Sequence, residues 1–226
     1  MSSSTNDPLL EHAVRALSVP GVLIGHRTIA EGDEHALLPG EIEGFAGSVV
    51  KVRRASGAAR IVARELMARL GCPAQPVPRS ASGAPGWPKG IVGSIAHDAT
   101  AAVAALASSA DFGSLGIDIE PAEALEPDLL ELIAGPNERR RMQDDPFGGR
   151  LLFAAKEAVY KAVHPLDRIF LEHHDVEVDL ANRTAVVRTG RKVRLRFAIA
   201  THIVALAVIP RAAVGQGTAD DDSGRP

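Results

Sequence analysis

The sequence of 226 residues contains little cysteine and few aromatic residues. Its one cysteine, Cys72, excludes a disulfide within the chain and any zinc module built on several cysteines. The aromatic residues are six Phe, one Trp and one Tyr, so the core must consist mainly of Val, Leu, Ile and Ala. With 46% hydrophobic residues, a chain of this length can still bury a sizeable core without disulfides or a structural metal.

An excess of basic charge and long apolar runs are also lacking. Lys and Arg number 25 against 28 Asp and Glu, a net charge of −3, which argues against a general nucleic-acid binder. No apolar run approaches the roughly 18–20 residues of a membrane helix, and residues 1–8 lack the basic and apolar regions of a secretory signal. We therefore expect a cytoplasmic protein that binds neither nucleic acid nor membranes.

Proline and glycine divide the chain into segments with recognisable periodicity. The first half predicts one helix over 48–70 and a long loop over 71–90, which holds five prolines. Strands are predicted in this half over 22–24, 91–96 and 101–107.

The second half opens with a predicted strand over 115–120. Helices are predicted over 128–133, 137–143 and 147–163, the last ending before Pro165. Further strands are predicted over 176–180, 184–188, 193–200 and 202–209.

Each half thus combines one long helix with several antiparallel-looking strands. This pattern predicts an α+β fold of two similar subdomains related by a pseudo-twofold, each a small antiparallel sheet packed with a long helix. The boundaries we expect are 1–113 and 114–212, followed by a disordered tail over 213–226, which has no apolar pattern.

The segment Gly116-Ile117-Asp118-Ile119-Glu120 is the first candidate for chemistry. On a strand, Asp118 and Glu120 project to one side while Ile117 and Ile119 face the core. Two carboxylates on one face suit a hard divalent cation such as Mg²⁺. The alternative is a half-buried strand with a solvated acidic face.

The segment from Phe153 to Lys161 is the second candidate. Glu157 and Lys161 are four residues apart, so a helix brings them together. Taken alone, this spacing favours a surface ion pair, worth about 0.2–0.5 kcal/mol. Beside a metal, a third carboxylate and two lysines, Lys156 and Lys161, would hold and neutralise phosphate oxygens.

The third candidate runs from Trp87 to His97. A Gly-rich approach followed by Ser94 and His97 at a strand end could present donors to a phosphate. The alternative is a tight turn leading into a strand, with His97 as an ordinary loop residue.

In this order, the three segments resemble the 4′-phosphopantetheinyl transferases of the two-subdomain type associated with siderophore and peptide synthetases. The resemblance covers residues from about 20 to 210. It rests on Trp87-Pro88, Gly93-Ser94-Ile95-Ala96-His97, Gly116–Pro121, and Phe153–Lys161 followed by His164-Pro165-Leu166.

The resemblance implies a monomeric enzyme that transfers the 4′-phosphopantetheine arm of coenzyme A to a serine of an apo acyl or peptidyl carrier protein. Mg²⁺, or Mn²⁺, would bridge the diphosphate, and adenosine 3′,5′-bisphosphate would leave. Fatty-acid, polyketide and nonribosomal-peptide carriers all stay open as partners.

By the same resemblance, the metal ligands are Asp118, Glu120 and Glu157. Glu157 is also the expected general base, acting directly or through a metal-bound water that it orients. Lys161 is expected on the α-phosphate side as a catalytic and coenzyme-binding residue, with Lys156 near it. The second subdomain would therefore hold the metal and the catalytic groups.

The first subdomain would bind the phosphates of coenzyme A. His97 resembles the family histidine near the 3′-phosphate, and Ser94 lies in the same motif. The basic helix containing Lys51-Val52-Arg53-Arg54 and Arg60 resembles the one that contacts these phosphates, and Arg53 and Arg60 are the expected contacts. Arg79 is a weaker candidate. The pattern departs at three positions, where the usual aromatic, glycine and serine are replaced by Ser56, Ala59 and Ala154.

Two alternatives to transfer stay open. One is a coenzyme A-binding module without catalysis, which would not need Glu157 as a base. The other is a metal-dependent phosphohydrolase that uses the same carboxylates on water.

Two further runs of like residues stand out in the sequence. We interpret His173-His174 as a solvated loop, and Arg139-Arg140-Arg141 as a solvated helix face or a contact for an acidic carrier protein.

Overall fold

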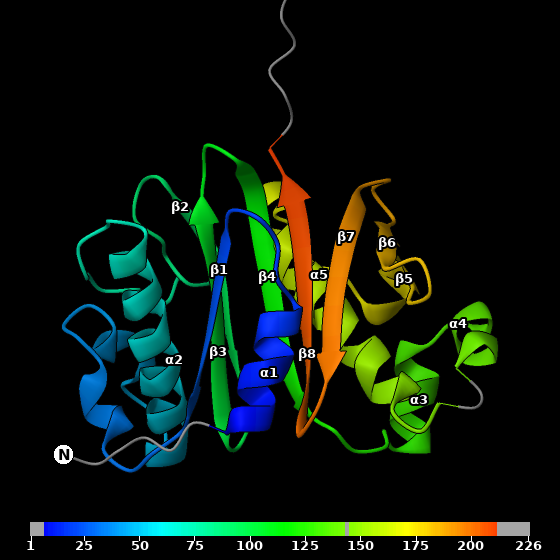
Figure 1. Ribbon diagram of the computed structural model, residues 1–226, viewed down its shortest axis with the longest axis horizontal. Coiled ribbons are helices and arrows are strands. Elements are labelled where there is room, and N and C mark those ends of the chain that lie inside the picture. Colours follow the sequence, from blue (N-terminus) through cyan, green and yellow to red (C-terminus); the bar gives the residue numbers. More distant parts are fainter. Residues whose placement is uncertain (1–6, 143–144, 212–226) are drawn as a thin grey trace, which may run out of the picture.

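The computed structural model describes residues 7–142 and 145–211. Two antiparallel sheets lie next to each other, each with one helix of 20 residues on its face (Figure 1). The predicted α+β architecture is therefore confirmed, whereas the predicted tail over 213–226 lies outside the described residues. None of the helices in the described ranges is long and apolar enough to cross a membrane.

The first unit is a three-stranded sheet with strand order β1-β3-β2. It contains β1 (Val22–Thr28), α2 (Val50–Arg69), β2 (Ile91–His97) and β3 (Ala101–Ser108). The central strand β3 consists of alanine and other apolar residues up to its last residue, Ser108. All of these apolar residues are buried. Helix α2 ends where Gly71 adopts φ +73 and the Cys72 N–H donates to the Met67 carbonyl. The short 3₁₀ turns η1 (Asp33–Ala36) and η2 (Ile42–Phe45) lie between β1 and α2.

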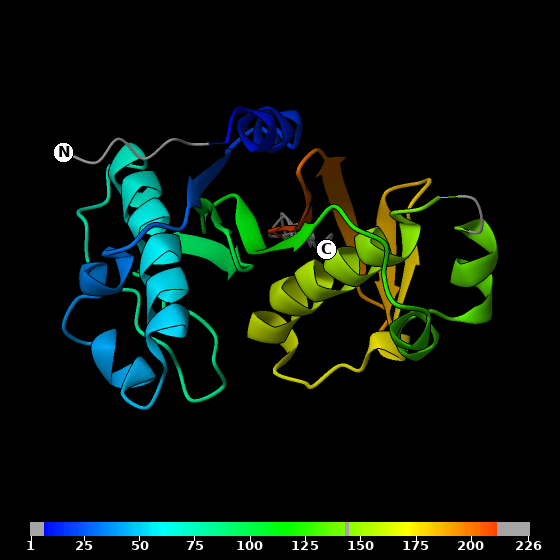
Figure 2. The same cartoon turned by 90° about the horizontal axis from the view of Figure 1, so that it is seen from below.

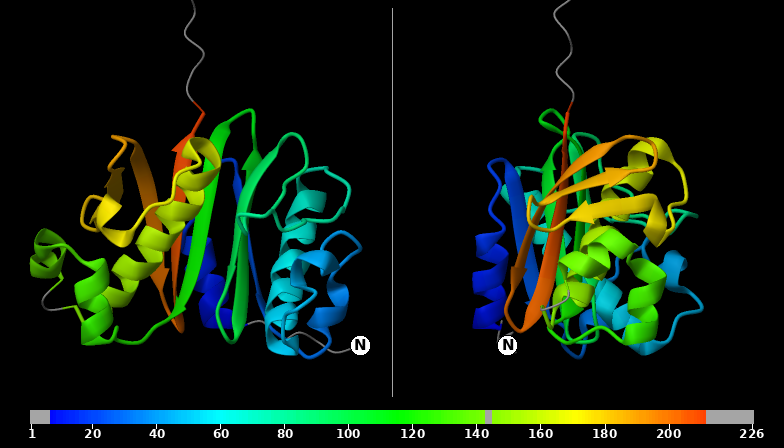
Figure 3. Two further views of the ribbon diagram at one scale, coloured as in Figure 1. Left: turned by 180° about the vertical axis from the view of Figure 1, so that it is seen from behind. Right: turned by 90° about the vertical axis from the view of Figure 1, so that its right-hand side faces the viewer.

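The second unit is a five-stranded sheet with strand order β4-β8-β7-β6-β5. Its strands are β4 (Phe112–Pro121), β5 (Val176–Asp179), β6 (Thr184–Val187), β7 (Lys192–Ile199) and β8 (His202–Pro210). Its helices are α3 (Pro127–Ile133), α4 (Pro136–Arg141) and α5 (Gly148–Asp167), followed by the 3₁₀ turn η3 (His173–Asp175). Figure 3 shows α5, in yellow-green, lying across the back of this sheet.

The two units share one connectivity. In the first, β1 leads into α2, and β3 returns to pair with both β1 and β2. In the second, β4 leads towards α5, and β8 returns to pair with both β4 and β7. This correspondence agrees with the predicted pseudo-twofold, to which the second unit adds β5, β6, α3 and α4.

Helix α1 (Pro8–Ala16) joins the units and was not predicted. Its apolar residues Leu10, Val14 and Leu17 pack in one core with strands of both sheets. This core lies on the faces opposite α2 and α5, as the placement of α1 in Figure 2 shows. The Asp7-Pro8 pair at its start could have indicated the helix, since Asp7 Oδ1 accepts from the N–H groups of Leu9 and Leu10.

Helix α5 extends further than predicted. It includes Pro165, although the sequence predicted an end before this residue. Proline removes the hydrogen bond to the carbonyl four residues earlier and crowds that carbonyl, but the preceding turns are held because Val159, Ala162 and Val163 are buried. The helix ends instead at Asp167, and the following residue, Arg168, has φ +52 and donates its backbone N–H to the His164 carbonyl.

Strand β4 and helix α5 touch backbone to backbone at Gly116. A Cβ at this position would lie 1.9 Å from the Ala158 carbonyl oxygen and 2.7 Å from the Ala162 nitrogen. Only glycine can therefore occupy this position without moving the helix. Because Asp118 and Glu120 follow on the same face of β4, this contact places both of them beside α5.

We predict that Gly116→Ala lowers the free energy of unfolding by about 1–3 kcal/mol or more, since the added methyl overlaps backbone atoms that cannot rotate away. Gly113→Ala on the same strand is the matched control, because its Cβ would come no closer than 3.5 Å to any neighbour. Urea unfolding measures both variants, and equal losses would contradict the close contact.

Candidate active site

The candidate site lies where the two units meet. Strand β4 is the edge of the second sheet and packs beside β2 and β3 of the first without joining their sheet. Asp118 and Glu120 come from β4, Glu157 and Lys161 from α5, and His97 from the end of β2. Residues from both halves of the chain are thus brought to one junction.

Asp118 forms the centre of this group. Its Oδ1 accepts a hydrogen bond of 2.6 Å from Lys161 Nζ, which also lies 3.3 Å from the Ile117 carbonyl oxygen. Its Oδ2 is buried and has no hydrogen-bond partner. Burial raises the pKa of Asp118, the Lys161 cation acts against this, and Glu157 adds to the rise. Ile117 and Ile119 lie in the core, so the predicted division of the strand into two faces is confirmed.

Glu120 is held by an arginine that sequence reasoning missed. Arg150 Nη1 donates to Glu120 Oε2 at 3.2 Å, Nη2 donates to the Ala124 carbonyl, and the buried Nε has no partner. Burial, followed by the nearby Asp118, raises the pKa of Glu120. Arg150 precedes Glu157 by seven residues on α5, and this spacing alone would have placed both on one helix face.

Glu157 borders a cavity of about 590 Å³ on the second unit. Apolar and aromatic side chains, among them Tyr160, Phe170 and Val176, line this cavity together with charged and histidine side chains. The rings of Tyr160 and Phe170 meet edge to face, with centroids 6.1 Å apart. His173 also lines this cavity and belongs to the short turn η3, in line with the predicted loop and not with a metal cluster. Lys156, Glu157 and Tyr160 of this lining belong to the segment from Phe153 to Lys161 singled out in the sequence, whereas the lining residues after α5 carry no such motif.

The carboxylates fit a metal ion in part. Mg²⁺ is typically held by one or two carboxylates together with waters and substrate phosphates. The free, buried Oδ2 of Asp118 and the neighbouring Glu120 provide such a pair. Within the described parts of the chain, however, no three His, Cys, Asp or Glu side chains are placed to hold a metal ion, so the predicted set of Asp118, Glu120 and Glu157 does not form one metal cluster.

His97 lies at the exposed end of β2, next to this group. Partial loss of water around its imidazole lowers the pKa of His97, and the nearby Lys161 cation lowers it further. Ser94 is 4% exposed and lies three residues earlier in β2, so its side chain points to the opposite face. The predicted coenzyme A contact of Ser94 is therefore not supported, whereas His97 and Lys161 do come together.

Two models of one family match consecutive parts of the chain. The 4′-phosphopantetheinyl transferase N-terminal domain matches residues 40–107, and the 4′-phosphopantetheinyl transferase superfamily matches residues 114–207, which include Asp118, Glu120, Glu157 and Lys161. The chain belongs to the 4′-phosphopantetheinyl transferase superfamily. The resemblance drawn from the motifs is confirmed.

Curated relatives match this chain over part of their length. The 4′-phosphopantetheinyl transferase Svp of Streptomyces mobaraensis is 38% identical over 148 residues, covering 63% of this chain and 60% of the relative. The transferase Npt of Nocardia iowensis is 38% identical over 143 residues, covering 62% and 64%. Enterobactin synthase component D of Salmonella typhimurium is 38% identical over 93 residues, covering 38% and 37%.

The matched region thus spans less than two thirds of the length of Svp and Npt. Among solved structures, the holo-[acyl-carrier-protein] synthase of Thermotoga maritima matches at 24% identity over 42% of this chain and 61% of that chain. Its TM-score of 0.34 is too low to carry an argument about this member of the superfamily.

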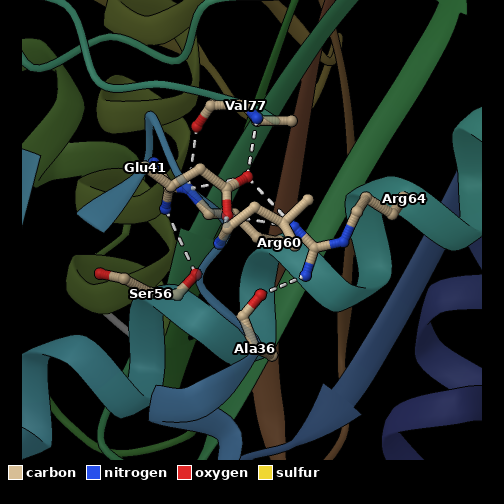
Figure 4. A network of polar contacts seen from close by, with 7 residues as sticks. Ala36, Glu41, Ser56, Arg60, Arg64 and Val77 are labelled. Atoms are coloured by element: carbon tan, nitrogen blue, oxygen red, sulfur yellow. Dashed lines mark hydrogen bonds and ion pairs between the residues drawn. The ribbon is translucent and has the colours of Figure 1, made fainter. Parts of the chain in front are cut away.

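Within this phosphopantetheinyl transferase scaffold, Arg60 is a structural residue (Figure 4). It is 3% exposed, donates to the carbonyls of Val77 and Ser56, and lies 3.7 Å from the fully buried Glu41. Glu41 also accepts from Arg64 and from the Val77 N–H. This buried network fastens the proline-rich loop to α2, so the predicted coenzyme A contact of Arg60 is not supported.

The other predicted arginines are more accessible. Arg53, half-buried, donates to the Ser48 carbonyl at 2.5 Å near the start of α2. Arg79 is exposed, and its guanidinium lies 5.6 Å from the centre of the Phe45 ring. Arg54 is instead paired with Glu34.

Lys156 is likewise buried among protein partners. Its ammonium donates to Glu138 Oε2 at 2.9 Å and to the carbonyls of Ile133 and His173 at 2.6 and 2.8 Å. Glu138 in turn accepts from the N–H groups of Gly135 and Val178. All three donors of the ammonium are used inside the protein, so the predicted coenzyme A contact of Lys156 is not supported.

We predict that Lys156→Met lowers the free energy of unfolding by about 3–5 kcal/mol, because it leaves the Glu138 carboxylate buried without its cation. Adding Glu138→Gln should restore part of the loss, since the amide oxygen still accepts from the backbone. Lys89→Met at an exposed position is the control. Denaturant unfolding measures the series, and a Lys156→Met protein as stable as the control would contradict the structural role.

Proposed function

We propose that the protein transfers the 4′-phosphopantetheine arm of coenzyme A to a serine of an apo carrier protein and releases adenosine 3′,5′-bisphosphate. The observation that carries the proposal is the Asp118–Lys161 pair, which sits beside Glu157 at the junction of the two units and keeps one carboxylate oxygen open. Membership of the superfamily supports the same activity.

The two units would divide the work. Residues 1–113 would hold the phosphates of coenzyme A through His97, with Arg53 and Arg79 as accessible cations. Residues 114–212 would hold the diphosphate and the acceptor serine. The name of one relative, enterobactin synthase component D, favours a carrier protein of siderophore or secondary-metabolite biosynthesis. We propose a cytoplasmic monomer as the working form.

The reaction requires that negative charge on the diphosphate be neutralised. Lys161 is a partly exposed cation at the junction and would bind the diphosphate oxygens. Asp118 and Glu120 would hold Mg²⁺ or Mn²⁺, which would polarise these oxygens as a Lewis acid. Arg150 orients Glu120 for this purpose, because it holds one of the two carboxylate oxygens in place.

The serine hydroxyl must lose its proton as it attacks. Its oxygen forms a bond to the phosphorus that carries pantetheine, and the bond from that phosphorus to the bridging oxygen breaks. The bridging oxygen leaves with the electron pair on adenosine 3′,5′-bisphosphate. Glu157 is proposed to accept the serine proton, because it lies near Asp118 and borders a cavity of the second unit that can receive a ligand.

The cavity beside Glu157 would receive the pantetheine arm. Its walls combine apolar and aromatic side chains, Tyr160, Phe170 and Val176 among them, with charged and histidine side chains, and its volume of about 590 Å³ is within the range of small-molecule sites. A flexible arm held there would keep its phosphorus near Glu157 and Lys161.

The direct test mixes the protein with coenzyme A, Mg²⁺ and an apo peptidyl carrier protein and follows the carrier by mass spectrometry. We predict a mass gain of one phosphopantetheine arm, which EDTA abolishes and added Mg²⁺ restores. Loss of coenzyme A without carrier modification would indicate a phosphohydrolase. Binding of coenzyme A without turnover on a panel of acyl and peptidyl carriers would indicate a binding module.

We predict that Glu157→Gln slows single-turnover transfer by about 10²–10⁴-fold, because glutamine cannot take the serine proton. Coenzyme A affinity, measured by calorimetry, should change far less, since the nucleotide end is held by the first unit. Glu131→Gln, at an exposed position of α3, is the matched control. A loss below about tenfold would fall short of general-base catalysis and exclude Glu157 as the base.

A further inference from the structure

A polar network joins the two units directly beside the proposed site. We call it the junction latch; its members are Asp7, Asp98, Thr100, Thr201 and His202. His202 Nε2 lies 3.1 Å from Asp98 Oδ2 and 2.9 Å from Thr100 Oγ1. Thr201 Oγ1 donates to Asp7 Oδ2 at 2.5 Å and lies 3.1 Å from His202 Nδ1. The turn between β2 and β3, the start of β8 and the start of α1 are thereby tied together.

Asp98 connects the two units through its two oxygens. Oδ1 accepts from the N–H groups of Thr100 and Ala101 and so shapes its own turn. Oδ2 faces His202 of the second unit. Burial alone would raise the pKa of Asp98, but the hydrogen bonds from His202 and from the two N–H groups bring it down to about 2. The side chains of His202 and Asp98 are 12% and 13% exposed, so water competes little for this contact.

The junction latch lies next to His97 in β2 and next to the end of β4 that carries the carboxylates. The proposed reaction needs a fixed distance between these two groups. Asp98 directly follows His97 in the chain. His202 pairs with Pro121 across β4 and β8, and the neighbouring pair joins Glu120 to Ile203. Strands β2 and β4 belong to different sheets, so no ladder of hydrogen bonds sets the distance between His97 and the carboxylates of β4. The junction latch provides directional hydrogen bonds between the β2–β3 turn and the start of β8.

We propose that Asp98 and His202 are positioning residues that set the location of His97 relative to Asp118 and Glu120. This inference rests on the proposed function, in which His97 meets the 3′-phosphate of coenzyme A. Neither residue touches the ligand in this scheme. Their loss would let the β2–β3 turn shift and weaken the contact to the 3′-phosphate, while the groups that act on the diphosphate stay in place.

The test compares the binding of coenzyme A and dephospho-coenzyme A, which lacks the 3′-phosphate, by calorimetry. In His202→Ala, the Kd for coenzyme A should rise about tenfold, the effect of losing one hydrogen bond to a charged group. The Kd for dephospho-coenzyme A should stay within about twofold. Asp98→Asn should also raise the Kd for coenzyme A. The Kd of the double variant should be no higher than that of the single variant with the larger effect, because both substitutions break the same contact.

Two further variants separate positioning from stability. His202→Gln retains a side-chain N–H and should recover part of the discrimination between the two ligands. Arg191→Gln breaks the ion pair to Asp167 within the second unit and should leave both affinities unchanged. Denaturant unfolding identifies the variants that are folded. If His202→Ala does not fold, the test of the proposal rests on Asp98→Asn.

Two results would overturn the positioning role of Asp98 and His202. One is a folded variant that discriminates between coenzyme A and dephospho-coenzyme A as strongly as the wild type, and the other is a folded variant that loses affinity for both ligands equally. Equal affinities in the wild type would overturn it as well, because no 3′-phosphate contact would then exist. Failure of the proposed function looks different. The wild type would then discriminate between the ligands and respond to the variants, yet transfer nothing to a carrier protein.

Discussion

The backbone contact between Gly116 and α5 is the constraint on which the site depends. Because no side chain separates β4 from the helix, the next residues on that strand face come directly against the helix surface. Asp118 thus reaches Lys161, although the two are 43 residues apart in the chain. The same approach places Glu120 beside Arg150, so one glycine positions Asp118 and Glu120, the proposed metal ligands, together with Lys161 and Arg150.

Three buried or nearly buried carboxylates show what distinguishes a functional group from a structural one. Glu41 is bound by two arginines and Glu138 by one lysine, both also accept from backbone N–H groups, and neither keeps an open acceptor oxygen. Asp118 has one cation and one buried oxygen without a partner. Since buried polar atoms are nearly always satisfied in folded proteins, an open oxygen at Asp118 is maintained against stability and points to a ligand.

The repeated connectivity of the two units explains why the site lies between them. Each unit presents a long helix on the same side of its sheet, and α1 covers the opposite side of both. The helices have diverged in their polar residues. In α2, Arg60 and Arg64 are committed to Glu41 and the loop after the helix, whereas Glu157 and Lys161 of α5 face the junction. The same scaffold therefore carries different sets of polar residues in its two copies.

The sequence by itself determined the features that depend on local periodicity. Alternation along residues 116–120 was enough to assign Asp118 and Glu120 to one face, and the four-residue spacing of Glu157 and Lys161 was enough to join them on a helix. Only the tertiary structure decided that Arg60, Lys156 and Ser94 are buried. Burial depends on packing between segments that are distant in the chain, such as those that carry Asp98 and His202. A local sequence pattern cannot predict which polar side chain meets a partner across such a contact.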